Sequence, residues 1–159
     1  MLGKVKQQLL EAGGLDESRL EAALSHSLSK GADFADLYFQ SSRSESWMLE
    51  DQKVKNGSHS IDAGVGVRVN NGEKTGFAYS DAMTNEGMMK AVKTASSIAH
   101  LQKQVPAIKI KASKIPQFYT NNDVLQGVDN AEIIALLNQM DNMARKIDTR
   151  ITKVICSLA

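Results

Sequence analysis

The stretch Ile61-Asp-Ala-Gly-Val-Gly-Val-Arg-Val-Asn-Asn-Gly72 decides the fold of this chain. From Ile61 to Val69 apolar residues occupy every second position, which is the period of a β-strand with one buried face. Asn71-Gly72 follows, and this dipeptide favours a two-residue hairpin turn. The segment from Lys74 to Tyr79 then returns as the partner strand. A long alternating strand followed at once by a hairpin predicts an antiparallel sheet.

Further strands are predicted upstream of this hairpin. Residues 34–40 and 47–50 show the same alternation of apolar and polar side chains. The polar run Ser41–Ser46 is interpreted as the turn between them, and Asn56-Gly57-Ser58 as another turn. Residues 34–80 are therefore predicted to form an antiparallel meander.

Four segments have the 3.6-residue spacing of amphipathic helices, and we expect them to begin near Leu2, after Asp16, after Thr84 and after Asp129. Asp16 and Thr84 are predicted N-caps, and Asp129-x-x-Glu132 resembles a capping box. The apolar face predicted for the last helix comprises Ile133, Leu137, Met140, Ala144 and Ile147. The fold class predicted is α+β, with the helices on one face of the antiparallel sheet.

The chain ends at Ala159, inside a segment that reads as a strand from Ile151 to Leu158. Natural termini are usually exposed and polar. A terminus within an apolar strand predicts that this last strand is truncated and that residues 1–159 belong to a longer chain.

Composition limits the classes of function. Lys+Arg is 19 and Asp+Glu is 18, a net charge of +1, which gives no reason to expect nucleic acid as a partner. No window approaches the ~18 apolar residues of a membrane helix, so no membrane partner is expected. The N-terminus lacks the pattern of a secretory signal. Cys156 is the single cysteine and is interpreted as a small core residue. These features predict a cytoplasmic protein.

No catalytic or metal-binding constellation is visible in the sequence. His26, His59 and His100 are far apart, so no pair has the spacing that places two zinc ligands on one helix face. No serine lies in G-x-S-x-G. Acidic residues such as Glu45 and Asp51 are interpreted as facing solvent. The sequence predicts no catalytic residue, no metal ligand and no cofactor in this chain, and no enzymatic activity for this chain alone.

The glycines of the central strand leave two interpretations open. Gly64 and Gly66 share one strand face with Arg68, so this face carries a stripe of bare backbone that another element can approach closely. The stripe either receives a helix or marks a strand bend, or it forms a groove for an extended peptide or a partner, with Arg68 as an anchor. A dinucleotide site is rejected, because a hairpin rather than a helix follows these glycines.

Several segments together resemble the TldD branch of the TldD/PmbA family, whose members were historically labelled modulators of DNA gyrase. The segments are Asp36–Ser42, Glu45–Asp51, Ile61–Arg68 and Gly72–Tyr79, with weaker matches at 118–125 and 130–147. The resemblance implies that residues 1–159 are the N-terminal α/β domain of a longer two-domain zinc metallopeptidase, and that the catalytic C-terminal domain is absent from this chain.

The family's metal motif, H-E-x-x-x-H, is expected beyond Ala159, so none of its ligands is assigned to a position here. The resemblance further implies zinc in the full-length protein, short or unfolded peptides as substrates, and a related PmbA/TldE-like subunit as partner. The role of this domain would be substrate access and assembly. The alternative is a stand-alone protein-interaction module without catalysis that binds through Gly64, Gly66 and Arg68.

Overall fold

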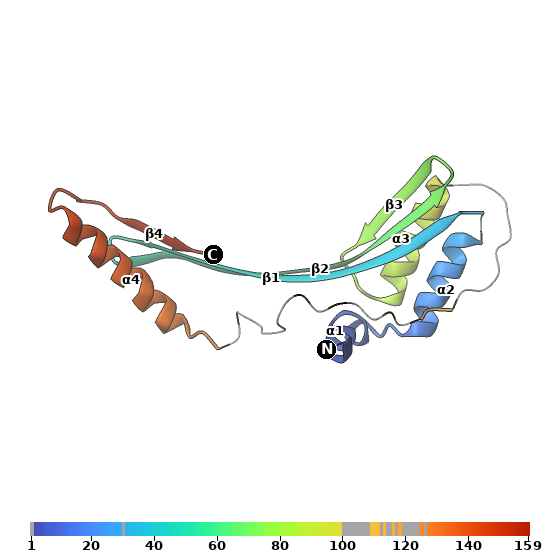
Figure 1. Ribbon diagram of the computed structural model, residues 1–159, viewed down its shortest axis with the longest axis horizontal. Helices are drawn as coiled ribbons and strands as arrows, with labels where there is room; N and C mark the ends of the chain where they lie inside the picture. Colours follow the sequence, from blue (N-terminus) through green and yellow to red (C-terminus); the bar gives the residue numbers. More distant parts are fainter. Residues whose placement is uncertain are drawn as a thin grey trace. The chain divides into compact units, whose positions relative to one another are not determined.

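The computed structural model describes residues 2–29, 31–99 and 127–159, together with 109–111, 113, 116, 118 and 125. Its strands form one antiparallel sheet in the order β3-β2-β1-β4. The predicted α+β class is confirmed. In chain order (Figure 1) the elements are α1 (Leu2–Leu9), the 3-10 turn η1 (Glu11–Gly13), α2 (Glu17–Leu28), β1 (Phe34–Glu50), β2 (Lys53–Asn71), β3 (Lys74–Ser80), α3 (Asn85–Ile98), α4 (Asn130–Ile147) and β4 (Ile155–Leu158).

The chain divides into two compact units, and β1 and β2 contribute residues to both. The first unit comprises Met1–Ser42 and Asp62–Phe118. The second unit comprises Arg43–Ile61 and Tyr119–Ala159. Each unit has its own hydrophobic core. In the described part of the chain no helix is long and apolar enough to cross a membrane.

The core of the first unit lies between the sheet and the helices α2 and α3, which stand beside one another in Figure 1. Val65, Val67 and Val69 of β2 are buried on this side, because side chains alternate between the two faces along a strand. Gly76 of β3 lets α3 come close, since a Cβ atom there would lie 2.0 Å from the carbonyl oxygen of Ala95. The buried apolar residues of α3 are Met88, Ala91, Val92 and Ala95.

Side-chain caps fix the starts of three helices. The Asp16 carboxylate accepts a hydrogen bond of 2.9 Å from the backbone N–H of Arg19, so the predicted cap of α2 is confirmed. The Thr84 hydroxyl accepts one of 3.2 Å from Gly87 at the start of α3, which confirms the second predicted cap. The Asp129 carboxylate likewise accepts from the second residue of α4.

The hairpin between β2 and β3 differs from the prediction by one position. Asn71 pairs with Lys74, so the two loop residues are Gly72 and Glu73 rather than Asn71 and Gly72. Asn71 is buried, and its side-chain amide donates a 3.0 Å hydrogen bond to the carbonyl oxygen of Ala99. This bond holds Asn71 in the strand, and Gly72 takes the left-handed conformation that the turn requires, with φ 55°.

The turn predicted within Ser41–Ser46 is wrong, because β1 runs without interruption from Phe34 to Glu50. Asn56-Gly57-Ser58 is also not a turn and lies inside β2. Both segments are polar and mostly exposed, so they lack an apolar face that would indicate a strand. The true turn is Asp51–Gln52, where φ is 49° and 63°.

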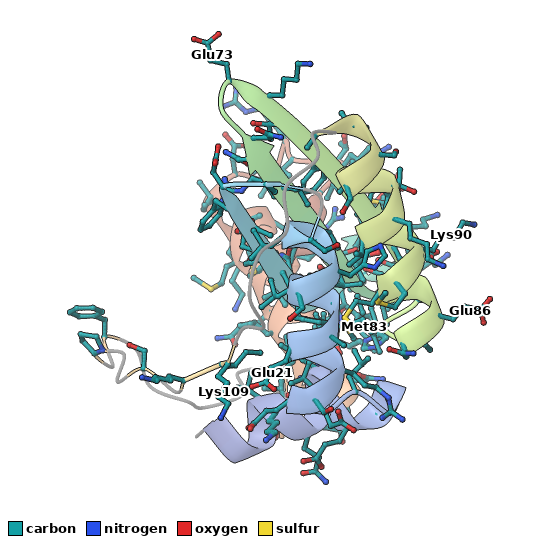
Figure 2. All side chains as sticks on the ribbon, turned by 90° about the vertical axis from the view of Figure 1, so that its right-hand side faces the viewer. Glu21, Glu73, Met83, Glu86, Lys90 and Lys109 are labelled. Atoms are coloured by element: carbon teal, nitrogen blue, oxygen red, sulfur yellow. The ribbon has the colours of Figure 1, made fainter. Side chains whose placement is uncertain are left out.

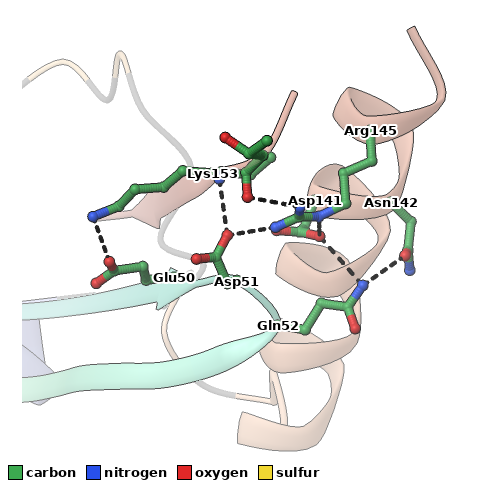
Figure 3. Close-up of polar contacts among 9 residues, drawn as sticks. Glu50, Asp51, Gln52, Asp141, Asn142, Arg145 and Lys153 are labelled. Carbon is green, nitrogen blue, oxygen red and sulfur yellow. Dashed lines mark hydrogen bonds and ion pairs between the residues drawn. The ribbon is translucent and has the colours of Figure 1, made fainter. Parts of the chain in front are cut away.

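Contacts from α4 and from the chain before β4 support this strained turn (Figure 3). The Asp51 carboxylate accepts a 3.0 Å hydrogen bond from the N–H of Val154 and pairs with the Arg145 guanidinium. Arg145 also donates through Nε to Asp141, 2.8 Å away, whose side chain is fully buried. The pKa of Asp51 is lowered, first by the Val154 hydrogen bond and then by the one from Arg145.

The second unit packs α4 against β1 and the C-terminal segment. Its buried apolar residues are Leu49, Ile133, Leu137, Val154 and Cys156. The core role predicted for Cys156 is therefore confirmed. Strand β4 begins at Ile155, four residues later than predicted, although Ile151 still contacts this core.

Two members of the apolar face predicted for α4 are not in this core. The side chains of Met140 and Ile147 are 43% and 82% exposed. The prediction is wrong for these two residues, because β1 and the C-terminal segment cover only one side of the helix's apolar arc.

Candidate functional site

A hollow of about 280 Å³ lies on the sheet face opposite the α2–α3 layer of the first unit. Gly64 and Gly66 of β2 form part of its floor. The aromatic side chains of Tyr38, Phe77 and Tyr79 line it and are exposed. Aromatic surface around bare backbone suits contact with an extended apolar segment.

The two glycines differ in how much room their surroundings leave for a side chain. A Cβ atom at Gly64 would lie 2.8 Å from the backbone oxygen of Ser80, which is too close. A Cβ atom at Gly66 would touch the Phe77 ring at 3.4 Å, an ordinary contact distance. A larger side chain at Gly66 would extend into the hollow.

The structure provides evidence on the first interpretation of the glycine stripe, in which a helix packs against it. Helices α2 and α3 pack against the valine face of β2, so neither covers Gly64 and Gly66. The second interpretation, contact with a peptide or partner, stays a prediction.

Arg68 is on the same strand face but does not line the hollow. Its guanidinium group binds both oxygens of the Asp36 carboxylate, at 3.0 and 2.9 Å, and lies 5.7 Å from the centre of the Phe34 ring. The hydrogen bonds from Arg68 to Asp36 raise the pKa of Arg68. The proposed anchor is thus already paired, and a ligand carboxylate would have to displace Asp36.

The sheet order limits how a peptide could bind at this hollow. Strand β2 lies between β1 and β3, and its residues Val65–Asn71, which include Gly66, are paired with β3. An extended segment over Gly64 and Gly66 would therefore be held by side-chain contacts. Main-chain pairing is open at the outer edges of β3 and β4. It is also open along β2 before Val65 and along β1 before Trp47, because β3 pairs only with Val65–Asn71 and β4 only with Trp47–Glu50.

A second hollow, of about 360 Å³, follows the outer edge of β3 beside α3. Residues Ala78–Asp81 form its strand side, while Gly87 and Lys90 are among those contributed by α3. Figure 2 shows the side chains of Glu86 and Lys90 projecting outward from α3. Sequence reasoning missed this hollow, because it depends on how closely α3 approaches the edge strand.

Titratable side chains are dispersed. Glu45 pairs with the imidazole of His59 at 3.0 Å, and Glu50 pairs with Lys153 at 2.6 Å, which lowers the pKa of Glu50. His26 is half-buried in α2, and His100 lies outside the described residues. Among the residues that the structure describes, no three His, Cys, Asp or Glu side chains gather where they could hold a metal.

Comparison with known proteins identifies the family. Residues 35–99 match the family model described as "PmbA/TldA metallopeptidase domain 1". A protein of Haemophilus influenzae named "Metalloprotease TldD homolog" is 38% identical over 162 residues, covering 100% of this chain and 33% of that protein. The chain belongs to the TldD/PmbA family. A second TldD homolog, from Buchnera aphidicola, is 35% identical over 97% of this chain and 32% of its own length.

Solved structures show the same fold. A Thermotoga maritima protein described as a modulator of DNA gyrase has a TM-score of 0.62 and 16% identity, covering 89% of this chain and 35% of that one. TldE from Thermococcus kodakarensis has a TM-score of 0.59 and 15% identity, covering 87% of this chain and 32% of that one. This TldD/PmbA-family chain thus spans about a third of the relatives it matches.

Proposed function

We propose that this chain is the N-terminal substrate-access and assembly domain of a cytoplasmic zinc metallopeptidase that acts on short or unfolded peptides. The observation that carries the proposal is the match, at 35–38% identity over nearly the whole chain, to proteins named metalloprotease TldD homologs. Since the chain spans about a third of those proteins, residues 1–159 are proposed to be one domain of a longer polypeptide and to have no activity alone.

The metal of this proposal has no ligand set among the described residues. We therefore assign no step of peptide hydrolysis to them. The ligands would belong to the catalytic C-terminal domain, and the partner would be a TldE-like subunit, in keeping with the fold shared with TldE.

The contribution proposed for this domain is contact with an extended peptide over Gly64 and Gly66. Support comes from the exposed rings of Tyr38, Phe77 and Tyr79 around a floor without side chains. Binding through ring faces makes little demand on peptide sequence, which suits unfolded substrates.

The test compares Gly66→Leu with Gly66→Ala in the full-length polypeptide, using cleavage of an unstructured peptide. Leucine fills the hollow, whereas alanine adds one Cβ at ordinary contact distance from Phe77. We expect Gly66→Leu to raise KM with little change in kcat, because ground-state contacts are lost, and Gly66→Ala to resemble the parent. Unchanged kinetics in a folded Gly66→Leu protein would refute the role of this hollow.

The second candidate function is a stand-alone interaction module that uses the same face without catalysis. The exposed aromatic residues favour it equally. Unlike the peptidase proposal, this function requires that a partner protein binds the 159-residue chain itself. Gly66→Leu would then abolish this binding while the fold stays intact.

A further inference from the structure

Strand β1 has an open outer edge along much of its length. One side of β1 lies against β2, and β4 pairs with the other side only from Trp47 to Glu50. In the part of the chain that the structure describes, no other strand lies beside this edge. A long edge of unpaired N–H and C=O groups invites pairing with another segment, so native proteins cover such edges. The edge of β1 before Trp47 is therefore a surface for an added strand.

Strand β4 runs toward this open edge. The two strands are antiparallel, and the last pair of their ladder joins Leu158 to Trp47. In this register each further residue after β4 lies beside the preceding residue of β1. Positions 160 and 161 of a longer polypeptide would therefore lie opposite Glu45 and Ser44.

The backbone groups of Glu45 face the side on which β4 runs. The N–H of Asp51 donates a 3.0 Å hydrogen bond to the carbonyl oxygen of Val154, on the β4 side of β1. Along an antiparallel strand every second residue turns its N–H and C=O toward the same neighbour. Counted back from Asp51, these residues are Leu49, Trp47 and then Glu45. Glu45 thus offers a donor and an acceptor at the point that position 160 would reach.

The faces of the sheet also continue in register. Cys156 and Leu158 pack in the core of the second unit. Position 160 would lie on their side of the sheet, because side chains alternate along a strand. Position 161 would lie on the other side, where Ser44 and Ser46 present small side chains.

Covalent attachment selects the occupant of this edge. A free peptide or a second copy of the chain would lose translational and rotational freedom on pairing with β1. A segment that follows Ala159 is already held in register by β4, so its pairing is intramolecular and avoids that cost. Chain length is available for it, since this chain covers only 33% and 32% of two TldD homologs that it matches.

From this register and edge, we propose that in the longer polypeptide the residues directly after Ala159 continue β4 along the outer edge of β1, opposite Glu45 and Ser44. The connection from this domain to the rest of the polypeptide is then a strand of its sheet rather than a flexible linker. The inference rests on the proposed longer polypeptide, but not on its peptidase activity.

A disulfide in the full-length polypeptide tests the register. Ser44→Cys is combined with a cysteine at position 161, because this non-hydrogen-bonded pair would have Cα atoms about 4.5 Å apart, within the range of a disulfide. Met48→Cys with the same cysteine is the matched control, since Met48 is exposed on the same face of β1 but four residues, or about 14 Å, away. Mild oxidation is followed by mass spectrometry of the joined peptides. We expect the 44–161 disulfide to form at least tenfold faster than the 48–161 disulfide, and equal rates would overturn the proposal.

Hydrogen exchange supplies a test that needs no substitution. The amide of Glu45 should exchange at least tenfold more slowly in the full-length polypeptide than in the 159-residue chain. The amide of Leu49, which already faces β4, is the internal reference. Equal exchange at Glu45 would contradict the proposal, and so would protection of Glu45 without the 44–161 disulfide, because another segment or partner would then occupy the edge. Neither readout uses cleavage, so a full-length protein that forms the disulfide but cleaves no peptide would refute only the proposed function.

Discussion

Replacing Gly76 by alanine tests how closely α3 packs on the hairpin of the first unit. A Cβ atom at this position would lie 2.0 Å from the carbonyl oxygen of Ala95 and 2.9 Å from its carbonyl carbon. Real Cβ contacts are essentially never below 3.0 Å, so the helix backbone must retreat by about 1 Å. Because Gly76 has no left-handed φ, the change adds a steric clash without a change of backbone conformation.

The cost follows from overpacking a buried site. Forcing atoms into a well-packed core destabilises proteins by about 1–3 kcal/mol, and a clash with backbone belongs at the upper end of that range. Gly66→Ala on the opposite sheet face is the matched control, because its Cβ would lie at ordinary contact distances, 3.4 Å from the Phe77 ring and 3.9 Å from the backbone oxygen of Tyr38. For this control we expect no loss and a gain of up to about 1 kcal/mol, since glycine is unfavourable within a strand.

The assay is equilibrium unfolding in urea followed by far-ultraviolet circular dichroism, with the parent chain measured in parallel. Gly76→Ala should lower the midpoint, while the slope against urea stays unchanged. A Gly76→Ala protein within about 0.5 kcal/mol of the parent would refute the close approach of α3, as would an equal loss in Gly66→Ala.

Two further predictions concern the second unit, where Trp47 is the only tryptophan of the chain and its fluorescence reports local unfolding. Leu137→Ala removes a fully buried side chain and should lower the free energy of unfolding by about 2–5 kcal/mol. Leu136→Ala, at an exposed position, should lower it by less than about 1 kcal/mol. Similar losses for the two variants would contradict the assigned core. The lowered pKa of Asp51 contributes stability at pH values above about 3.9 that is lost as the pH falls through the folded-state pKa. Asp51→Asn should therefore be less stable than the parent at pH 6, and the difference should shrink toward pH 3; a constant difference would exclude this linkage.

The elements with strong local signals could be predicted from the sequence. The alternation through Val65, Val67 and Val69 identified the central strand and its buried face. Asp16 and Thr84 marked helix starts, because a side-chain cap is a local hydrogen bond that needs no tertiary contact.

The long hairpin of β1 and β2 could not be predicted in the same way. Its polar middle has no apolar face, so Ser41–Ser46 looks like a turn although it is strand. The true turn at Asp51 and Gln52 uses positive φ angles without glycine. Its support comes from Arg145, 94 positions away in sequence, and such a contact leaves no local signal.

The candidate site was predictable only in part. The alternation of side chains along β2 predicts the bare stripe of Gly64 and Gly66. In the structure, α2 and α3 do not cover this stripe. The aromatic walls depend on the register of neighbouring strands, which pairs Gly66 with Tyr79. The exposure of Met140 and Ile147 likewise depends on which part of the α4 apolar arc the sheet covers.

The central claim is that this chain is one domain of a metallopeptidase whose metal site lies elsewhere in the polypeptide. The direct measurement is metal content and cleavage of an unstructured peptide, with and without a chelator, for the 159-residue chain and for the product of the complete reading frame. We expect the 159-residue chain to bind no zinc and to cleave nothing, and the complete product to bind zinc and lose its activity with the chelator. Chelator-sensitive cleavage by the 159-residue chain, or a complete product without metal-dependent cleavage, would contradict this account.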